Sequence, residues 1–195
     1  MNYFTADSHF SLADHTIIPR DFRPFESLEE MNNQIFEIWN KQAGEDDFIY
    51  HLGDFVNYNC FDNKGYLECF ELVKKIRARV VLILGNNENK ILTKEFGGDF
   101  EKFKQFLLDI GFHDVIEKRL YLDINGNNYC LTHRPTDCDL KSNYNLFGHI
   151  HKCGFVKKFG FNVGVDNHYF KLFSGEDIED LESRRKYFDE DVYIV

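Results

Sequence analysis

The chain contains short runs of apolar residues, each of which ends at a polar or glycine-containing turn. Runs of this kind are typical of buried β-strands. Asn125 and Gly126 form a two-residue turn that predicts a β-hairpin between Leu120–Ile124 and Asn128–Thr132. The predicted strands lie at Tyr3–Ala6, Phe48–Leu52, Val80–Leu84, Tyr129–Thr132, Asn145–Phe147 and Phe161–Val165.

Helical patterns separate several of these strands. The clearest is Ser27–Gln42, which opens on a capping-box signature and continues with an apolar face at helical spacing. Further helices are expected at Tyr66–Arg77, at Phe100–Ile110 and in the charged segment Glu176–Asp191. The first half of the chain therefore alternates strand and helix, whereas the second half is mainly strands.

Length and composition favour a single domain over residues 1–195, because no segment has the composition of a linker. The 23 Lys and Arg residues against 33 Asp and Glu residues give a formal net charge of −10. Nucleic-acid binding relies on Lys and Arg to neutralise phosphates, so a long nucleic acid is an unfavourable partner. A small anionic substrate is not excluded, because a local positive site can outweigh the net charge.

The sequence also indicates a cytoplasmic protein without a membrane partner. It has no signal-peptide pattern, and it lacks a run of about 18 apolar residues that could span a membrane. The 5 cysteines show no C-x-x-C spacing, so reduced and mostly buried thiols are expected.

Polar residues with metal-binding side chains follow the predicted strands. Ligand sites in open α/β sheets gather at the carboxyl ends of strands, so residues distant in sequence can converge there. Asp oxygens, imidazole nitrogens and an Asn carbonyl oxygen suit Mn²⁺ first, with Fe, Zn²⁺ or Ni²⁺ as alternatives. The set is too large for one tetrahedral ion and predicts two divalent ions sharing a carboxylate. Its members are Asp7, His9, Asp54, Asn86, His133, His149 and His151.

The residues around these motifs, including Arg23-Pro24-Phe25 and Asn162-Val163-Gly164-Val165-Asp166, resemble a small branch of the calcineurin-like metallophosphoesterases from bacteria and phages. The order of the motifs themselves resembles that of the whole superfamily. The resemblance rests on Asp7-x-His9, Gly53-Asp54, Gly85-Asn86, His133 and Gly148-His149-x-His151, and it covers nearly the whole chain. It implies an α/β fold with four layers, in which two mixed β-sheets pack face to face with helices outside.

The resemblance also implies how the ligands divide. Asp7, His9 and His151 would hold one ion, and Asn86, His133 and His149 the other, with Asp54 bridging them. A hydroxide shared by the two ions would then attack the phosphorus atom, because bound metal lowers the pKa of water to about 7. The expected activity is hydrolysis of a phosphodiester or phosphomonoester in a small or nucleotide-like substrate.

One position departs from the family pattern. The family usually has His after Gly-Asn, where the imidazole acts near the leaving group, but this chain has Asn87. General acid catalysis typically contributes about 10²- to 10⁴-fold, so Asn87, His15 and Arg134 are the candidate catalytic residues to examine. The alternative hypothesis is a metal-loaded protein that binds a phosphate ligand but has lost efficient turnover. A purely structural protein is a third hypothesis.

Several other polar residues have structural interpretations. His51, His113 and His168 are expected to be structural, and Asn162 and Asp166 to hold the loop beside the metals. For His15, Arg20 and Arg23, hydrogen bonds that fix the first helix and contacts to a phosphate substrate are equally compatible with the sequence.

Overall fold

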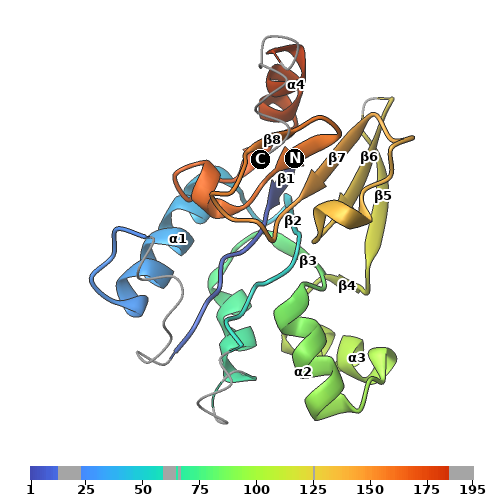
Figure 1. Ribbon diagram of the computed structural model, residues 1–195. Helices are drawn as coiled ribbons and strands as arrows, with labels where there is room; N and C mark the ends of the chain where they lie inside the picture. The colour runs from blue at the N-terminus through green and yellow to red at the C-terminus, as the bar shows by residue number, and fades with distance from the viewer. Residues whose placement is uncertain (13–22, 59–64, 66, 125, 185–195) are drawn as a thin grey trace.

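The computed structural model describes residues 1–12, 23–58, 65, 67–124 and 126–184. The first sheet has the strand order β10-β1-β2-β3-β4. Strands β1 (Asn2–Thr5), β2 (Phe48–His51), β3 (Arg79–Ile83) and β4 (Asp114–Ile116) are parallel, while β10 (Phe173–Ser174) is antiparallel to β1. The carboxyl ends of these parallel strands therefore lie at one edge of the sheet (Figure 1).

The second sheet has the order β5-β6-β7-β9-β8 and is also mixed. Strands β5 (Arg119–Ile124) and β6 (Asn127–Thr132) form the antiparallel hairpin, and β6, β7 (Tyr144–Phe147) and β9 (Gly160–Asn162) are parallel. Strand β8 (Val156–Lys157) pairs antiparallel with β9. The predicted hairpin is confirmed, with Ile124 opposite Asn127.

Alternation along the first sheet divides its side chains between two cores. Tyr3 and Ile49 belong to a core shared with helices α1 (Leu28–Gln42), η1 (Glu68–Lys75), α2 (Asn86–Phe96) and α3 (Phe100–Ile110). Phe4 and Leu52 point the other way, into a second core with Tyr129 and the other inward residues of the second sheet. The expectation of two mixed sheets packed face to face with helices outside is confirmed.

The far side of the second sheet is covered by the segment that begins with the short helix η2 (Pro135–Asp137). The side chain of Asn145, on β7, accepts a hydrogen bond from the backbone of Asp139 at 2.8 Å and donates one to its carbonyl at 2.9 Å. Helix α4 (Gly175–Arg184) packs Ile178 against the core between the sheets. No helix in the described ranges combines the length and the apolar character needed to cross a membrane.

Two predicted elements differ in kind or extent from those observed. The predicted helix Tyr66–Arg77 is the 3₁₀ helix η1, in which Phe70, Val73 and the following Ile76 are buried at a spacing of three. A helix with three residues per turn keeps all three on one face, which explains the form adopted. The predicted strand Phe161–Val165 ends at Asn162, whose side chain accepts a hydrogen bond from the Gly164 N–H at 3.0 Å and turns the chain.

Other differences concern helices. Helix α2 was not predicted, although Ile91, Leu92 and the closing Gly97 are signals that could have identified it. The predicted last helix is observed as α4 up to Arg184, and the rest of its range lies outside the described residues. The described cysteines are free thiols, of which Cys69 and Cys130 are buried.

Candidate metal centre

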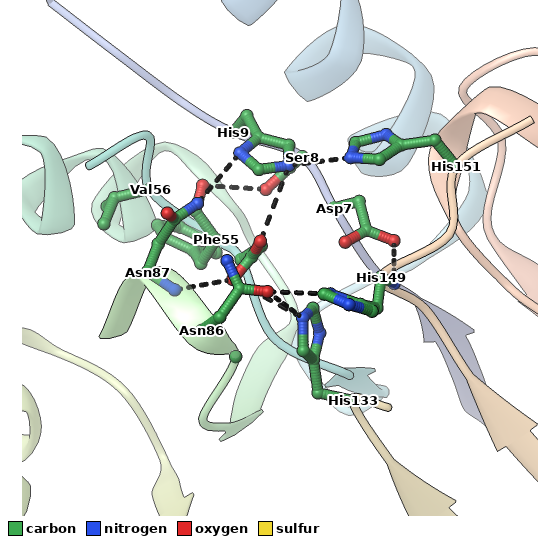
Figure 2. Close-up of polar contacts among 12 residues, drawn as sticks. Asp7, Ser8, His9, Phe55, Val56, Asn86, Asn87, His133, His149 and His151 are labelled. Atoms are coloured by element: carbon green, nitrogen blue, oxygen red, sulfur yellow. Dashed lines mark hydrogen bonds and ion pairs between the residues drawn. The ribbon is translucent and has the colours of Figure 1, made fainter. Parts of the chain in front are cut away.

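The predicted ligands converge at the carboxyl ends of strands from both sheets (Figure 2). In the first sheet, Asp7 and His9 follow β1, Asp54 follows β2, and Asn86 opens helix α2 after β3. In the second sheet, His133 follows β6, and His149 and His151 follow β7. All seven therefore lie where the two sheets meet.

One half of the cluster contains Asp7, His9 and His151, named here the His9 group. Their candidate ligand atoms all lie within 4.8 Å of one another. Nε2 of His9 is 3.3 Å from Nε2 of His151, and the two rings are stacked. Burial lowers the pKa of His9 well below its usual value, so the ring is neutral.

The other half contains Asn86, His133 and His149, named here the His133 group. Oδ1 of Asn86 is 3.0 Å from Nε2 of His133 and 2.7 Å from Nδ1 of His149. Burial is the main cause that lowers the pKa of His133 to about 4 and also lowers that of His149. Both rings are therefore neutral near pH 7.

The contacts within the His133 group are compatible with a bound cation. Nδ1 of His133 donates its hydrogen to the Leu52 carbonyl at 2.8 Å, so Nε2 of the neutral ring carries a lone pair. This lone pair faces Oδ1 of Asn86, another acceptor, at 3.0 Å. Ligands on adjacent corners around an ion with bonds of about 2.1 Å lie about 3.0 Å apart. A bound divalent ion would therefore convert a repulsive contact into coordination.

The Asp7 carboxylate is likewise compatible with a bound cation. Its Oδ2 accepts the His149 N–H at 2.8 Å, but Oδ1 is buried without a hydrogen-bond partner among the described residues. Burial raises the pKa of Asp7 to about 8, although the nearby His151 opposes this effect. A buried carboxylate oxygen without a partner is costly unless it binds a cation.

The backbone at the ligands is strained. Asp7, His9, Asp54, His149 and His151 have φ between 46° and 73°, in the left-handed region that side chains other than Gly seldom occupy. Such residues gather at functional sites where the surrounding structure holds them in place. Five of the seven predicted ligands share this feature, which the sequence pattern does not reveal.

Two glycines that precede ligands are required by close approach of the chain. A Cβ atom on Gly85 would lie 2.3 Å from both the nitrogen and Oδ1 of Asp54. A Cβ atom on Gly148 would lie 2.6 Å from Oδ2 of Asp7. The glycines in the Gly-Asn and Gly-His motifs therefore allow neighbouring strand ends to bring their ligands together.

Glu88 organises the loop that carries Asp54. Its buried carboxylate accepts hydrogen bonds from the N–H groups of Gly85, Asp54, Phe55 and Val56 at 2.8 to 3.3 Å. Burial and the nearby Asp54 raise the pKa of Glu88, while these hydrogen bonds lower it. Sequence reasoning assigned Glu88 no role, because its position at the start of a helix is visible only if α2 is predicted.

Arg23 and Asp166 support the His9 group through hydrogen bonds. Arg23 pairs with both carboxylate oxygens of Asp166 at 2.8 and 3.1 Å, and donates to the backbone carbonyls of Asp7 and Ser8. Asp166 in turn lies 2.8 Å from Nδ1 of His151. Burial alone would raise the pKa of Asp166, but the hydrogen bonds from His151 and Arg23 hold it well below its usual value. Arg23 therefore has a structural role, one of its two interpretations.

Two further predictions about supporting residues are confirmed by these contacts. Asn162 donates to the His151 carbonyl at 2.6 Å, so Asn162 and Asp166 both hold the loop beside the ligands. His51 is buried against Trp39 and Phe55, and its Nε2 contacts the Ser8 hydroxyl at 2.9 Å. His51 therefore positions the loop between Asp7 and His9.

Comparisons with known proteins place this fold and site in a family. The family model described as calcineurin-like phosphoesterase matches residues 3–191. The chain belongs to the calcineurin-like phosphoesterases. An uncharacterized protein of Methanocaldococcus jannaschii is 31% identical over 152 residues, which are 76% of this chain and 68% of that protein.

Solved structures share the fold of this phosphoesterase. A protein of unknown function from Aquifex aeolicus has a TM-score of 0.62 at 20% identity, covering 93% of this chain and 98% of that chain. An archaeal phosphodiesterase has a TM-score of 0.50 at 17% identity, covering 91% and 94%. Family membership makes the protein a metal-dependent hydrolase of phosphate esters, and the grouped Asp and His residues are candidates to bind the metal.

The three candidate catalytic residues of this phosphoesterase have different surroundings. Asn87 is buried, with its Nδ2 3.2 Å from Nδ1 of His9 and its backbone N–H donating to Oδ1 of Asp54 at 2.9 Å. Arg134 is exposed beside His133 and lines a cleft. His15 lies outside the described residues, as does Arg20.

Proposed function

We propose that the phosphoesterase binds two divalent ions, one in the His9 group and one in the His133 group, with Asp54 between them. The observation that carries this proposal is the position of the Asp54 carboxylate. Its Oδ2 lies 3.8 Å from Nε2 of His9, and its Oδ1 lies 3.6 Å from Nε2 of His133. One oxygen therefore faces each group, as a bridging ligand requires.

The donor set favours Mn²⁺, with Fe, Zn²⁺ and Ni²⁺ as alternatives. The proposed ligands are imidazole nitrogens, carboxylate oxygens and the Asn86 amide oxygen, and the set contains no thiolate. Ions bound there would supply Lewis acidity and lower the pKa of water at the phosphorus atom. Asp166 and Leu52 orient His151 and His133 for this purpose through their Nδ1 atoms.

We propose a small or nucleotide-like substrate, either a phosphodiester or a phosphomonoester. The net charge of −10 disfavours a long polyanion, whereas a single phosphate would be neutralised by the ions themselves. Helix α2 begins at the same site, where the Asn87 N–H donates to Asp54, and the positive end of the helix dipole favours an anion there.

Hydrolysis of bis(p-nitrophenyl) phosphate tests the proposal. Metal-stripped protein should gain activity on addition of Mn²⁺, and Asp54→Ala should abolish it, while Asp46→Ala at an exposed position should not. Metal analysis of the same samples should find two ions per chain in the wild type. Activity that is unaffected by metal removal or by Asp54→Ala would refute the proposal, and a single bound ion would refute its dinuclear form.

A protein that binds a phosphate ligand with impaired catalysis is the second candidate. The observation in its favour is that Asn87 has no acidic proton to give and that its side chain contacts His9. Under this alternative, the metal-loaded wild type would bind phosphate esters but hydrolyse none of the substrates tested, whereas Asn87→His would restore turnover.

A further inference from the structure

A cleft opens beside the His133 group, and its lining includes His133 but not His9. Its volume is about 470 Å³, within the range of pockets that hold small molecules. His133 and Gly85 form the wall nearest the proposed metals. The charged residues of the lining are two basic ones, Lys118 and Arg134, and two acidic ones, Glu117 and Asp137. A group attached to a phosphate at the metals could therefore enter this cleft.

The charges in the cleft are unevenly paired. Nζ of Lys118 lies 3.4 Å from Oδ1 of Asp137, so these two charges compensate each other. Within the described part of the chain, no carboxylate forms an ion pair with Arg134, which is exposed. Arg134 and His133 line the same cleft, so the guanidinium lies beside the His133 group and is available to an anion.

The surroundings of Asn87 restrict the kind of leaving group that the site can release. An amide cannot donate a proton as an imidazolium does, and this amide is buried against His9. An alkoxide leaving group needs a proton, whereas a phosphate monoester leaves as a stable anion. A cation in the neighbouring cleft favours the same leaving group, because it stabilises the negative charge that the group gains.

We propose that the substrate is a phosphoanhydride, in which the cleft receives the second phosphate and Arg134 binds it. This inference rests on the proposed function, since it places the first phosphate at the metals. In the reaction, a water oxygen forms a bond to the first phosphorus and the bond from that phosphorus to the bridging oxygen breaks. The bridging oxygen keeps the electron pair and leaves with the second phosphate, while one proton of the water passes to solvent and the other stays on the new hydroxyl of the first phosphate.

Hydrolysis of ADP-ribose by the Mn²⁺-loaded protein is the first test. Anion-exchange chromatography should detect AMP and ribose 5-phosphate. Arg134→Gln should raise the KM for ADP-ribose by about 10- to 100-fold, the effect of losing a hydrogen-bonded charge. The change in KM for bis(p-nitrophenyl) phosphate, which has no second phosphate, should be much smaller. Arg134→Lys should lie between the wild type and Arg134→Gln, and Lys141→Gln, outside the cleft, serves as the control.

Calorimetric binding tests the cleft independently of turnover. The affinity for α,β-methylene-ADP, in which the bridging oxygen is replaced, should fall in Arg134→Gln by about 10- to 100-fold. The affinity for AMP, with a single phosphate, should fall much less. Equal losses for both ligands, or no loss for either, would overturn the proposal. If the wild type hydrolyses no substrate, the proposed function fails, and this binding comparison still decides the role of Arg134.

Discussion

At the scale of single residues, the candidate metal centre is held by strained backbone. Each left-handed residue other than Gly costs about 1 to 2 kcal/mol, and five of the proposed ligands have this conformation. The strain persists because backbone hydrogen bonds connect the loops, including Asp7 N–H to the Gly53 carbonyl and His9 N–H to the Asp54 carbonyl, both at 3.0 Å. The backbone around the ligands therefore holds their side chains in position.

Gly85→Ala should disturb this arrangement. The added Cβ would lie 2.3 Å from Asp54, so the two loops must move apart, and overpacking of this kind costs about 1 to 3 kcal/mol. We expect a lower free energy of unfolding and less bound metal per chain, measured by denaturant titration and metal analysis. Gly44→Ala is the matched control, because its Cβ would approach no atom closer than 3.8 Å. Full metal content in Gly85→Ala would contradict this explanation.

The effect of Asn87→His on kcat should depend on whether the leaving group needs a proton. An imidazole acid contributes about 10²- to 10⁴-fold only where the leaving group needs a proton. We therefore expect kcat to rise for a dinucleotide, which releases an alkoxide, and to change little for bis(p-nitrophenyl) phosphate. Kinetics on both substrates, with metal content measured in parallel, check this expectation. A uniform loss on both would instead indicate that Asn87 mainly supports His9, which its side chain contacts at 3.2 Å.

At the scale of elements, the ligands depend on contacts between segments that are distant in sequence. The Arg23 guanidinium joins the chain after β1 to Asp166 in helix η3 (Val165–Asn167), which lies 143 residues after Arg23. The Glu88 carboxylate in α2 likewise accepts hydrogen bonds from the backbone N–H groups that follow β2. The arrangement of the loops that carry the ligands therefore depends on buried charged groups as well as on the apolar cores.

Arg23→Ala should weaken both folding and metal binding. Removing one member of a buried ion pair costs about 3 to 5 kcal/mol, because Asp166 is left buried without its partner. Loss of this support for His151 should reduce metal affinity by about 10- to 100-fold. Denaturant titration and competition with a metal-binding dye measure the two effects. Arg79→Ala, at an exposed pair with Asp46, should change neither, and Arg23→Lys should recover only part of the loss.

At the scale of the whole molecule, the site joins the two sheets. Ligands from the first sheet face ligands from the second, and the backbone of Val165 donates to the Ala6 carbonyl at 3.0 Å close to Asp7. The sheets also share the buried core that contains Phe4 and Tyr129. We propose, as the composition predicts, that residues 1–195 form one domain whose stability depends on bound metal.

Metal addition should therefore raise the midpoint of a single unfolding transition. A ligand present at 100 times its Kd stabilises the folded state by about 2.7 kcal/mol per site. Calorimetric scans of metal-stripped protein with and without Mn²⁺ check this prediction, and Asp54→Ala should show a smaller shift. Two separate transitions, only one of which responds to Mn²⁺, would argue against a single domain.

The sequence by itself determined the longer strands, helix α1, the mixed sheets implied by the resemblance, and the set of residues that converge at the site. These features depend on local patterns: apolar runs, a capping box at Ser27, and polar residues immediately after strands. Short strands such as β8 and β10, each two residues long, carry too little pattern to be recognised. Helix α2 was missed because its buried residues are few and its first turn looked like part of a loop.

Only the tertiary structure decided how the site is held. The sequence left a structural role and a substrate contact equally open for Arg23. Its contacts with Asp166 and with the backbone after β1 support the structural role. The opposed lone pairs of Asn86 and His133, the unpartnered oxygen of Asp7 and the cleft beside Arg134 depend on distances between separate strands. Such distances follow from packing of the two sheets, which no local stretch of sequence specifies.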